Sequence, residues 1–302
     1  NIGRIGSDPV LKQWSIDTIA KYPQMIKDAV LDLTCATASI GFSYTEKLNN
    51  VRRYWLSDGS FWSINCGNHS QLPKVAHETI ADPEMRAIRF HREGKKDVVL
   101  CNWQCHAAWQ VAVHPEQISA DYVHELRKGA EENNDILFAY FNGANGDVVS
   151  KSQVASYQLP ISDADEQGRL LVPYLEKALA NMTPAKTGKL RMAKGHVDAV
   201  LKSFPEELLK KARRVADCED HAEAVALRKE LGFVSITEAG SILNHHNKRL
   251  RNGDTMPIHL GAISFGDIGF AKAPYEMFHT NGKQVRVGSP FPMTFVCSLT
   301  DG

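Results

Sequence analysis

A short, continuously apolar run from Ile136 to Phe141 sets the strictest limit on the fold. A strand without a polar face must be covered on both sides, which is typical of strands buried inside an α/β sheet. A second strand is predicted at Val98–Trp103, and the segment between them, Ser119–Asn133, has helical spacing with Ser119 as its expected N-cap. Because a helix of crossover length connects the two strands, we expect them to be neighbours.

Helical and extended patterns alternate along the rest of the chain. Further strands are predicted at Thr37–Tyr44, Met85–Phe90, Ile258–Phe265, Ile268–Ala273 and Phe291–Leu299. Helices are predicted over residues 8–33, where Pro23 should divide the pattern into two, over 164–182, and as a charged pair over 205–231. The alternation predicts an α/β fold, a layered domain with a mixed β-sheet flanked by helices. We take residues 1–302 as a single domain with a helical segment at about 203–231.

Composition excludes several classes of protein. Of 302 residues, 43% are hydrophobic, and Lys+Arg and Asp+Glu both number 35, so no basic excess favours nucleic-acid binding. No apolar run is long enough to form a transmembrane segment. The six cysteines form no CxxC pair, and both buried thiols and one or two disulfides fit their spread. The chain begins at Asn1 and ends just after a predicted strand, so we expect it to be part of a longer protein.

Two polar residues follow predicted strands and could carry chemistry. His106 comes just after Val98–Trp103, and imidazole is the commonest metal ligand, although a hydrogen-bonded structural histidine is the simpler interpretation. Glu276 follows Ile268–Ala273, where a carboxylate suits a metal ligand or general base, or simply a helix start at the surface. The adjacent His245 and His246 are interpreted as residues of a polar loop, since neighbours in an extended chain point apart.

A glycine-rich loop, Asn142–Asp147, follows the buried strand. Its glycines would let the backbone approach a ligand, and its N–H groups could hold an oxyanion, but an ordinary turn is an equal alternative. The chain has no HExxH, GxSxG or Rossmann motif. From the residues alone, the chain is an α/β domain with a possible metal site.

The order of several short segments resembles the catalytic domain of the neutral/alkaline ceramidase family. Their collinearity over nearly the whole chain carries the resemblance, since each motif is weak. The matching segments are Val51–Tyr54, Asp82–Glu84, Asn102–Ala107, Ser119–Tyr122, Gly143–Asp147, Gly266–Asp267 and Pro274–Phe278.

The resemblance implies a zinc site with two histidines, a glutamate and a tyrosine. His106 and Glu276 stand at two of these positions, so we expect their side chains to converge beside a cleft that is also lined by Gly143–Asp147. The other histidine belongs to a Thr-His-Thr-His-Ser-Gly-Pro segment that this chain lacks. The tyrosine is expected just beyond Gly302.

The resemblance also implies a reaction and a location. Zinc would activate water to hydrolyse an N-acyl amide of a small molecule or lipid, with Arg52, Asn145 and Asp147 as catalytic residues, and the protein would be exported or at the cell surface. Val149 replaces the serine that ceramidases carry after Gly-Asp-Val, which argues against ceramide itself as the substrate. The alternatives are a non-catalytic lipid- or glycan-binding relative, and a zinc esterase or peptidase.

Overall fold

The two strands predicted to be neighbours form the parallel pair of a mixed five-stranded sheet. The computed structural model describes residues 9–63, 72–109, 118–233 and 236–300. β7 (Asp97–Trp103) and β8 (Ile136–Asn142) run parallel in the strand order β10-β1-β6-β7-β8. The other pairings, among β10 (Thr183–Ala185), β1 (Thr37–Tyr44), β6 (Glu84–His91) and β7, are antiparallel. The carboxyl ends of β7 and β8 therefore meet at one edge of the sheet.

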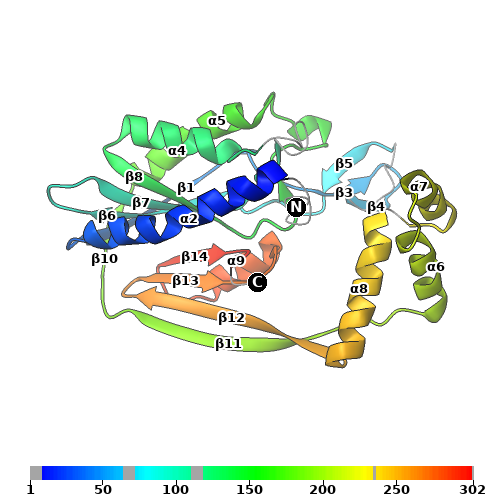
Figure 1. Ribbon diagram of the computed structural model, residues 1–302. Coiled ribbons are helices and arrows are strands. Elements are labelled where there is room, and N and C mark those ends of the chain that lie inside the picture. The colour runs from blue at the N-terminus through cyan, green and yellow to red at the C-terminus, as the bar shows by residue number, and fades with distance from the viewer. Residues whose placement is uncertain (1–8, 64–71, 110–117, 234–235, 301–302) are drawn as a thin grey trace.

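Helices α4 (Tyr122–Asn133) and α5 (Ala164–Ala180) cover one face of this sheet (Figure 1). Their apolar sides and the sheet form the main core, which includes Trp103, Tyr122 and Leu171. The predicted cap of α4 is wrong. Asp121 is the N-cap and its carboxylate accepts from Tyr122 N–H, whereas the Ser119 hydroxyl, two residues earlier, accepts from Asp121 N–H.

A second sheet packs against the other face. It contains β11 (Arg191–Val200), β12 (Thr255–Phe265), β13 (Ile268–Lys272) and β14 (Met293–Cys297), with α9 (His279–Val287) connecting the parallel pair β13–β14. An apolar cluster joins the two sheets; its buried members are Ala38, Ile88, Ile268, Met293, Phe295 and Cys297. The order helix, sheet, sheet confirms the predicted layered α/β fold with mixed sheets.

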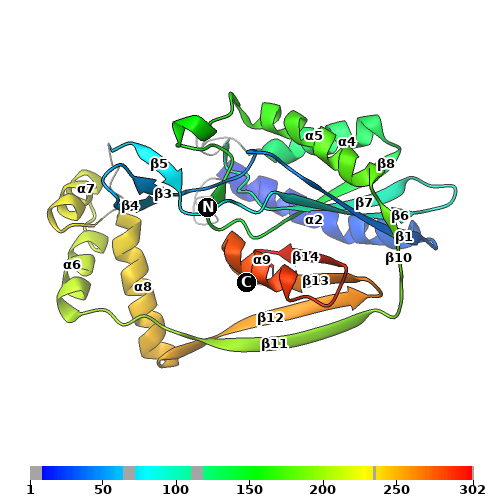
Figure 2. The same ribbon diagram turned by 180° about the vertical axis from the view of Figure 1, so that it is seen from behind.

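Three helices leave the second sheet between β11 and β12 and stand at the far end of that ribbon (Figure 2). They are α6 (Glu206–Ala216), α7 (His221–Glu230) and α8 (Ile236–Asn252). The first two confirm the predicted charged pair. The prediction of a loop around His245 and His246 is wrong, because both lie in α8, which Ala239 and Ile242 anchor at helical spacing.

The division of the first helix at Pro23 is also wrong. α2 (Pro9–Leu31) is one helix with Pro23 inside it, and none of its residues is buried. A proline in a helix removes one backbone hydrogen bond, and its ring crowds the preceding turn. In α2 these costs do not end the helix, which continues on both sides of Pro23. The Asp32 carboxylate ties the end of α2 to the β6–β7 turn through Arg92 and Lys95.

Short strands complete the edge where the candidate site lies. β2 (Asn50–Val51) pairs with β9 (Val148–Val149), and β3 (Arg53–Leu56) pairs with both β4 (Phe61–Ser63) and β5 (Lys74–His77). A 3-10 turn, η1 (Ala155–Tyr157), follows β9. Within the residues that the structure describes, no helix is long and apolar enough to cross a membrane.

The cysteines that the structure describes are free thiols. Cys101, Cys105 and Cys297 are buried, Cys218 is half-buried and Cys35 is exposed, while Cys66 lies outside the described residues. Burial raises the pKa of the Cys105 thiol to about 12, so this neighbour of His106 is not a thiolate near neutral pH.

Candidate metal and substrate site

His106 and Glu276 lie side by side although 170 positions separate them in the chain. The His106 Nε2 atom is 3.2 Å from Glu276 Oε1. His106 follows β7 and Glu276 follows β13, so one residue comes from each sheet. This confirms the predicted convergence of the two side chains, while their role as metal ligands stays a prediction.

Asn102, at the end of β7, holds the two sheets together at this edge. Its side-chain Nδ2 donates to the carbonyl oxygen of Phe141 on β8, at 2.9 Å, and to that of Val296 on β14, at 3.1 Å. The side chain is fully buried, so losing either bond would leave a polar group without water. Asn102 therefore fixes the separation of β7, which precedes His106, from β14, which pairs with the strand β13 that precedes Glu276.

The His106 imidazole is oriented by a backbone carbonyl. Its Nδ1 lies 3.3 Å from Val148 O, and because a carbonyl only accepts, this contact is a hydrogen bond in the form that carries a proton on Nδ1. Nε2 faces the Glu276 carboxylate oxygen, which can accept a hydrogen bond only if Nε2 carries a proton. A lone pair and a carboxylate oxygen at this distance repel each other unless a proton or a cation lies between them.

This donor set fits a zinc ion in part. A neutral imidazole nitrogen and a carboxylate oxygen are both zinc ligands, and a carbonyl that accepts from the other ring nitrogen is typical of ligating histidines. Within the described ranges, however, no group of three or more His, Cys, Asp or Glu side chains could hold a metal ion. The described residues thus supply two ligands.

The glycine-rich loop lies at the same edge as His106 but does not line the pocket there. Residues 143–147 are all buried, and His106 N–H donates to Val148 O just after them, at 3.0 Å. The prediction that Gly143–Asp147 lines the cleft is therefore wrong. The loop is covered because it packs against the segment that carries Glu276: Gly146 N–H donates to Met277 O at 2.8 Å.

Asp147 is a positioning residue in this arrangement. Its carboxylate accepts from the His279 backbone N–H at 2.8 Å and faces His279 Nδ1 at 2.9 Å, so it caps α9 from a distant loop. Burial raises the pKa of the Asp147 carboxyl, but the hydrogen bonds from His279 outweigh it, and the pKa lies below its ordinary value. A negative charge at a helix N-terminus is stabilising, which holds α9 and Glu276 in place.

The other two predicted catalytic residues also contact the loop. The Arg52 guanidinium donates from Nη2 and Nε to Gly146 O, at 3.0 and 3.3 Å. Asn145 is almost fully buried, and its Oδ1 has no hydrogen-bond partner among the described residues. A catalytic role for Arg52, Asn145 or Asp147 remains a prediction, and their contacts suit them to shaping the loop.

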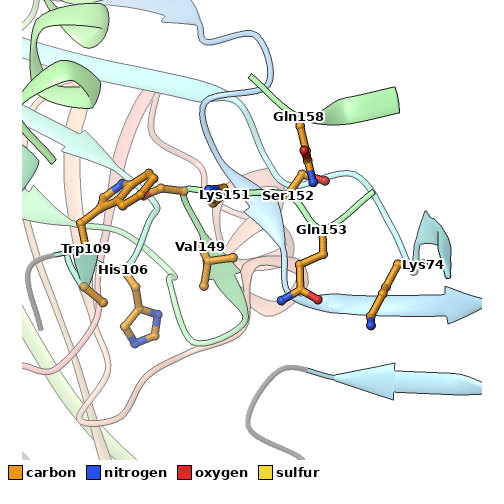
Figure 3. A pocket seen from close by; sticks show the side chains of 10 residues that line it. Lys74, His106, Trp109, Val149, Lys151, Ser152, Gln153 and Gln158 are labelled. Atoms are coloured by element: carbon orange, nitrogen blue, oxygen red, sulfur yellow. The ribbon is translucent and has the colours of Figure 1, made fainter. Parts of the chain in front are cut away.

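A pocket of about 510 Å³ opens beside His106 (Figure 3). Trp109 and Val149 bound it near the imidazole, and the segment after β9 lines it further along. The remaining described lining residues are Lys74, Ala108, Ser150, Lys151, Ser152, Gln153 and Gln158. Trp109 is itself held by a hydrogen bond from its indole N–H to Gln167 on α5.

Sequence reasoning did not find Lys74, Trp109, Lys151 or His279. Lys74 and Lys151 reach the pocket from short strands and turns whose pairing has no local signal. His279 follows the Pro274–Phe278 segment directly, so its place near the site could have been inferred from its position in the chain.

Searches by sequence found no match: neither a protein-family profile nor a curated protein matches the chain. The fold is similar to that of solved ceramidases. The neutral ceramidase from Pseudomonas aeruginosa aligns with a TM-score of 0.56 and 13% identity, over 91% of this chain and 46% of that one. A ceramidase complexed with C2 aligns with a TM-score of 0.52 and 11% identity, over 87% and 46%. The chain has a ceramidase-like fold and spans about half the length of those structures.

Proposed function

We propose that the protein is a zinc-dependent hydrolase of the neutral ceramidase type, which cleaves an N-acyl amide bond. The observation that carries this proposal is the 3.2 Å approach of His106 Nε2 to Glu276 Oε1 beside a pocket large enough for a small-molecule substrate. The ceramidase-like fold supports it.

His106 and Glu276 would hold the zinc ion together with ligands that the described residues do not supply. When bound, zinc would lower the pKa of a water molecule and polarise the amide carbonyl. By accepting from His106 Nδ1, Val148 O would favour the tautomer whose Nε2 is available as a ligand to the ion. Trp109 and Val149 would exclude water from one side of the scissile bond.

His106→Ala and Glu276→Gln should each lower zinc affinity by at least about a hundredfold, because a lost ligand costs no less than a lost outer partner of a ligand. Zinc content after dialysis and the hydrolysis of an N-acyl, ester and peptide panel measure this. His196→Ala, at an exposed position on β11, is the matched control and should change neither.

The outcomes separate the proposal from its rivals. Zinc bound through His106 with amide cleavage supports it, and cleavage of esters or peptides alone favours the zinc esterase or peptidase. A folded protein that binds no zinc and cleaves none of the panel contradicts the proposal and favours a non-catalytic lipid- or glycan-binding relative.

A further inference from the structure

We propose that the pocket beside His106 binds an anionic head group, so that the substrate is an N-acyl compound whose amine part carries a carboxylate or a sulfonate. This inference rests on the proposed function, because it takes the amide to be cleaved next to His106. The charge of the pocket wall carries it.

The described lining of the pocket contains two lysines, Lys74 and Lys151, and no acidic residue. The chain as a whole is neutral, with 35 basic and 35 acidic side chains, so the positive lining is local to the pocket. A concave surface lined by one sign of charge concentrates ligands of the opposite sign. The pocket therefore favours an anion over a neutral or cationic group.

Both lysines belong to the described lining of the pocket. Lys151 is exposed and makes no ion pair with any residue that the structure describes. The Lys74 Nζ atom lies 4.6 Å from the Trp62 ring centroid, which is a cation–π contact. An anionic ligand would reach the Lys151 ammonium group without displacing a carboxylate of the described residues.

The two lysines of the pocket lie in different places, with Lys151 between Trp109 and Ser152 (Figure 3). Trp109 and Val149 adjoin His106, whereas Lys74 lies across the pocket beyond Gln153 (Figure 3). An N-acyl compound with its amide at His106 could lay an apolar part against Trp109 and direct its anionic part toward the lysines.

The first experiment compares the binding of matched probes. N-lauroylglycine and N-lauroyltaurine carry an anion, whereas N-lauroylglycinamide is neutral and nearly the same size. Calorimetric titration of the protein in the presence of EDTA measures binding without turnover. We expect the two anions to bind about tenfold more tightly than the amide at low salt, and this advantage to shrink in about 0.5 M NaCl. Equal affinity for all three probes overturns the inference.

The second experiment assigns the preference to the pocket. Lys151→Met should remove most of the preference for an anion, and Lys151→Glu should favour the neutral amide. Lys211→Met, at an exposed lysine on α6, is the matched control and should leave the preference unchanged. A preference that survives Lys151→Glu contradicts the assignment to this pocket.

The same probes distinguish a failure of this inference from a failure of the proposed function. If the zinc-loaded protein hydrolyses the neutral amide at least as fast as the anions, the hydrolase stands and the head-group inference fails. If the anions bind in a Lys151-dependent way but no probe is hydrolysed, the pocket chemistry is supported and the proposed hydrolase is contradicted.

Discussion

At the scale of single residues, the position of Glu276 depends on the close approach of its backbone to that of Gly146. A Cβ atom at Gly146 would lie 2.2 Å from the carbonyl oxygen of Glu276, far inside van der Waals contact. Only glycine lets the loop pack this closely, and the loop in turn positions the segment between β13 and α9. Gly146 thus controls the place of Glu276 although it has no functional group.

Gly146→Ala should therefore displace Glu276 relative to His106. We expect a loss of about 1–3 kcal/mol in the free energy of unfolding, as for other overpacked sites. Activity should fall about a hundredfold, because a shift near 1 Å misaligns catalytic groups. Denaturant unfolding and hydrolysis rates measure the two effects. Gly195→Ala on β11, where an added Cβ meets nothing within 4 Å, is the control and should alter neither.

At the scale of elements, the helices α6, α7 and α8 form a unit with its own core. Leu209, Ala212, Val215 and Ile242 belong to an apolar cluster that shares no buried residue with the clusters of the two sheets. The unit is joined to the rest of the molecule through the long β11–β12 ribbon (Figures 1 and 2). We expect it to open independently of the site.

Leu209→Ala should loosen this unit alone. Leu209 is buried, and removing a buried leucine side chain costs about 2–5 kcal/mol. Hydrogen exchange should speed up in α6 and α8 and stay unchanged in β7 and β8, with zinc binding preserved. Leu250→Ala, at a leucine of α8 that is 71% exposed, is the control. Equal loss of protection in β7 and β8 would show that the helices and the sheets unfold as one unit.

At the scale of the whole molecule, a charge network ties α9 to the first sheet. Arg286 on α9 contacts the carboxylates of Asp82 and Glu84, each at 3.1 Å, and Arg86 on β6 contacts the same two groups. Burial raises the pKa of the Asp82 carboxyl, but the charges of Arg86 and Arg286 outweigh it, so the pKa is lowered. The network therefore stabilises the packing of the two sheets while Asp82 is ionised.

Arg286→Met should lower the free energy of unfolding by about 1.5–3 kcal/mol near neutral pH, as for hydrogen bonds to charged groups. Because the folded pKa of Asp82 lies below its unfolded value, the stabilisation is fully present above the unfolded pKa of about 4 and is lost as pH falls through the folded pKa. The difference between variant and wild type should thus shrink in acid. Urea unfolding at several pH values measures it, with Lys283→Met on the surface of α9 as control. A difference that does not change with pH would rule out this origin.

Much of the fold could be predicted from the sequence, because the signals are local. The continuously apolar run predicted β8, and the alternation of apolar and polar residues predicted β1 with its observed bounds. Apolar residues at helical spacing predicted α4, α5 and the charged pair α6 and α7. Where local signals conflicted, prediction failed. A proline did not divide α2, and a polar string around His245 proved helical, since one apolar face of α8 was enough to anchor it.

The family resemblance selected His106 and Glu276 as the candidate metal ligands, and Arg52, Asn145 and Asp147 as the candidate catalytic residues. The approach of His106 to Glu276 depends on two sheets that pack face to face, with Asn102 bridging them and Asp147 capping α9. Only the tertiary structure decided that the glycine-rich loop is buried and that Lys74 and Lys151 line the pocket. Contacts between residues so far apart in the chain leave no periodic pattern, because they are selected by packing and charge in three dimensions rather than by neighbours in sequence.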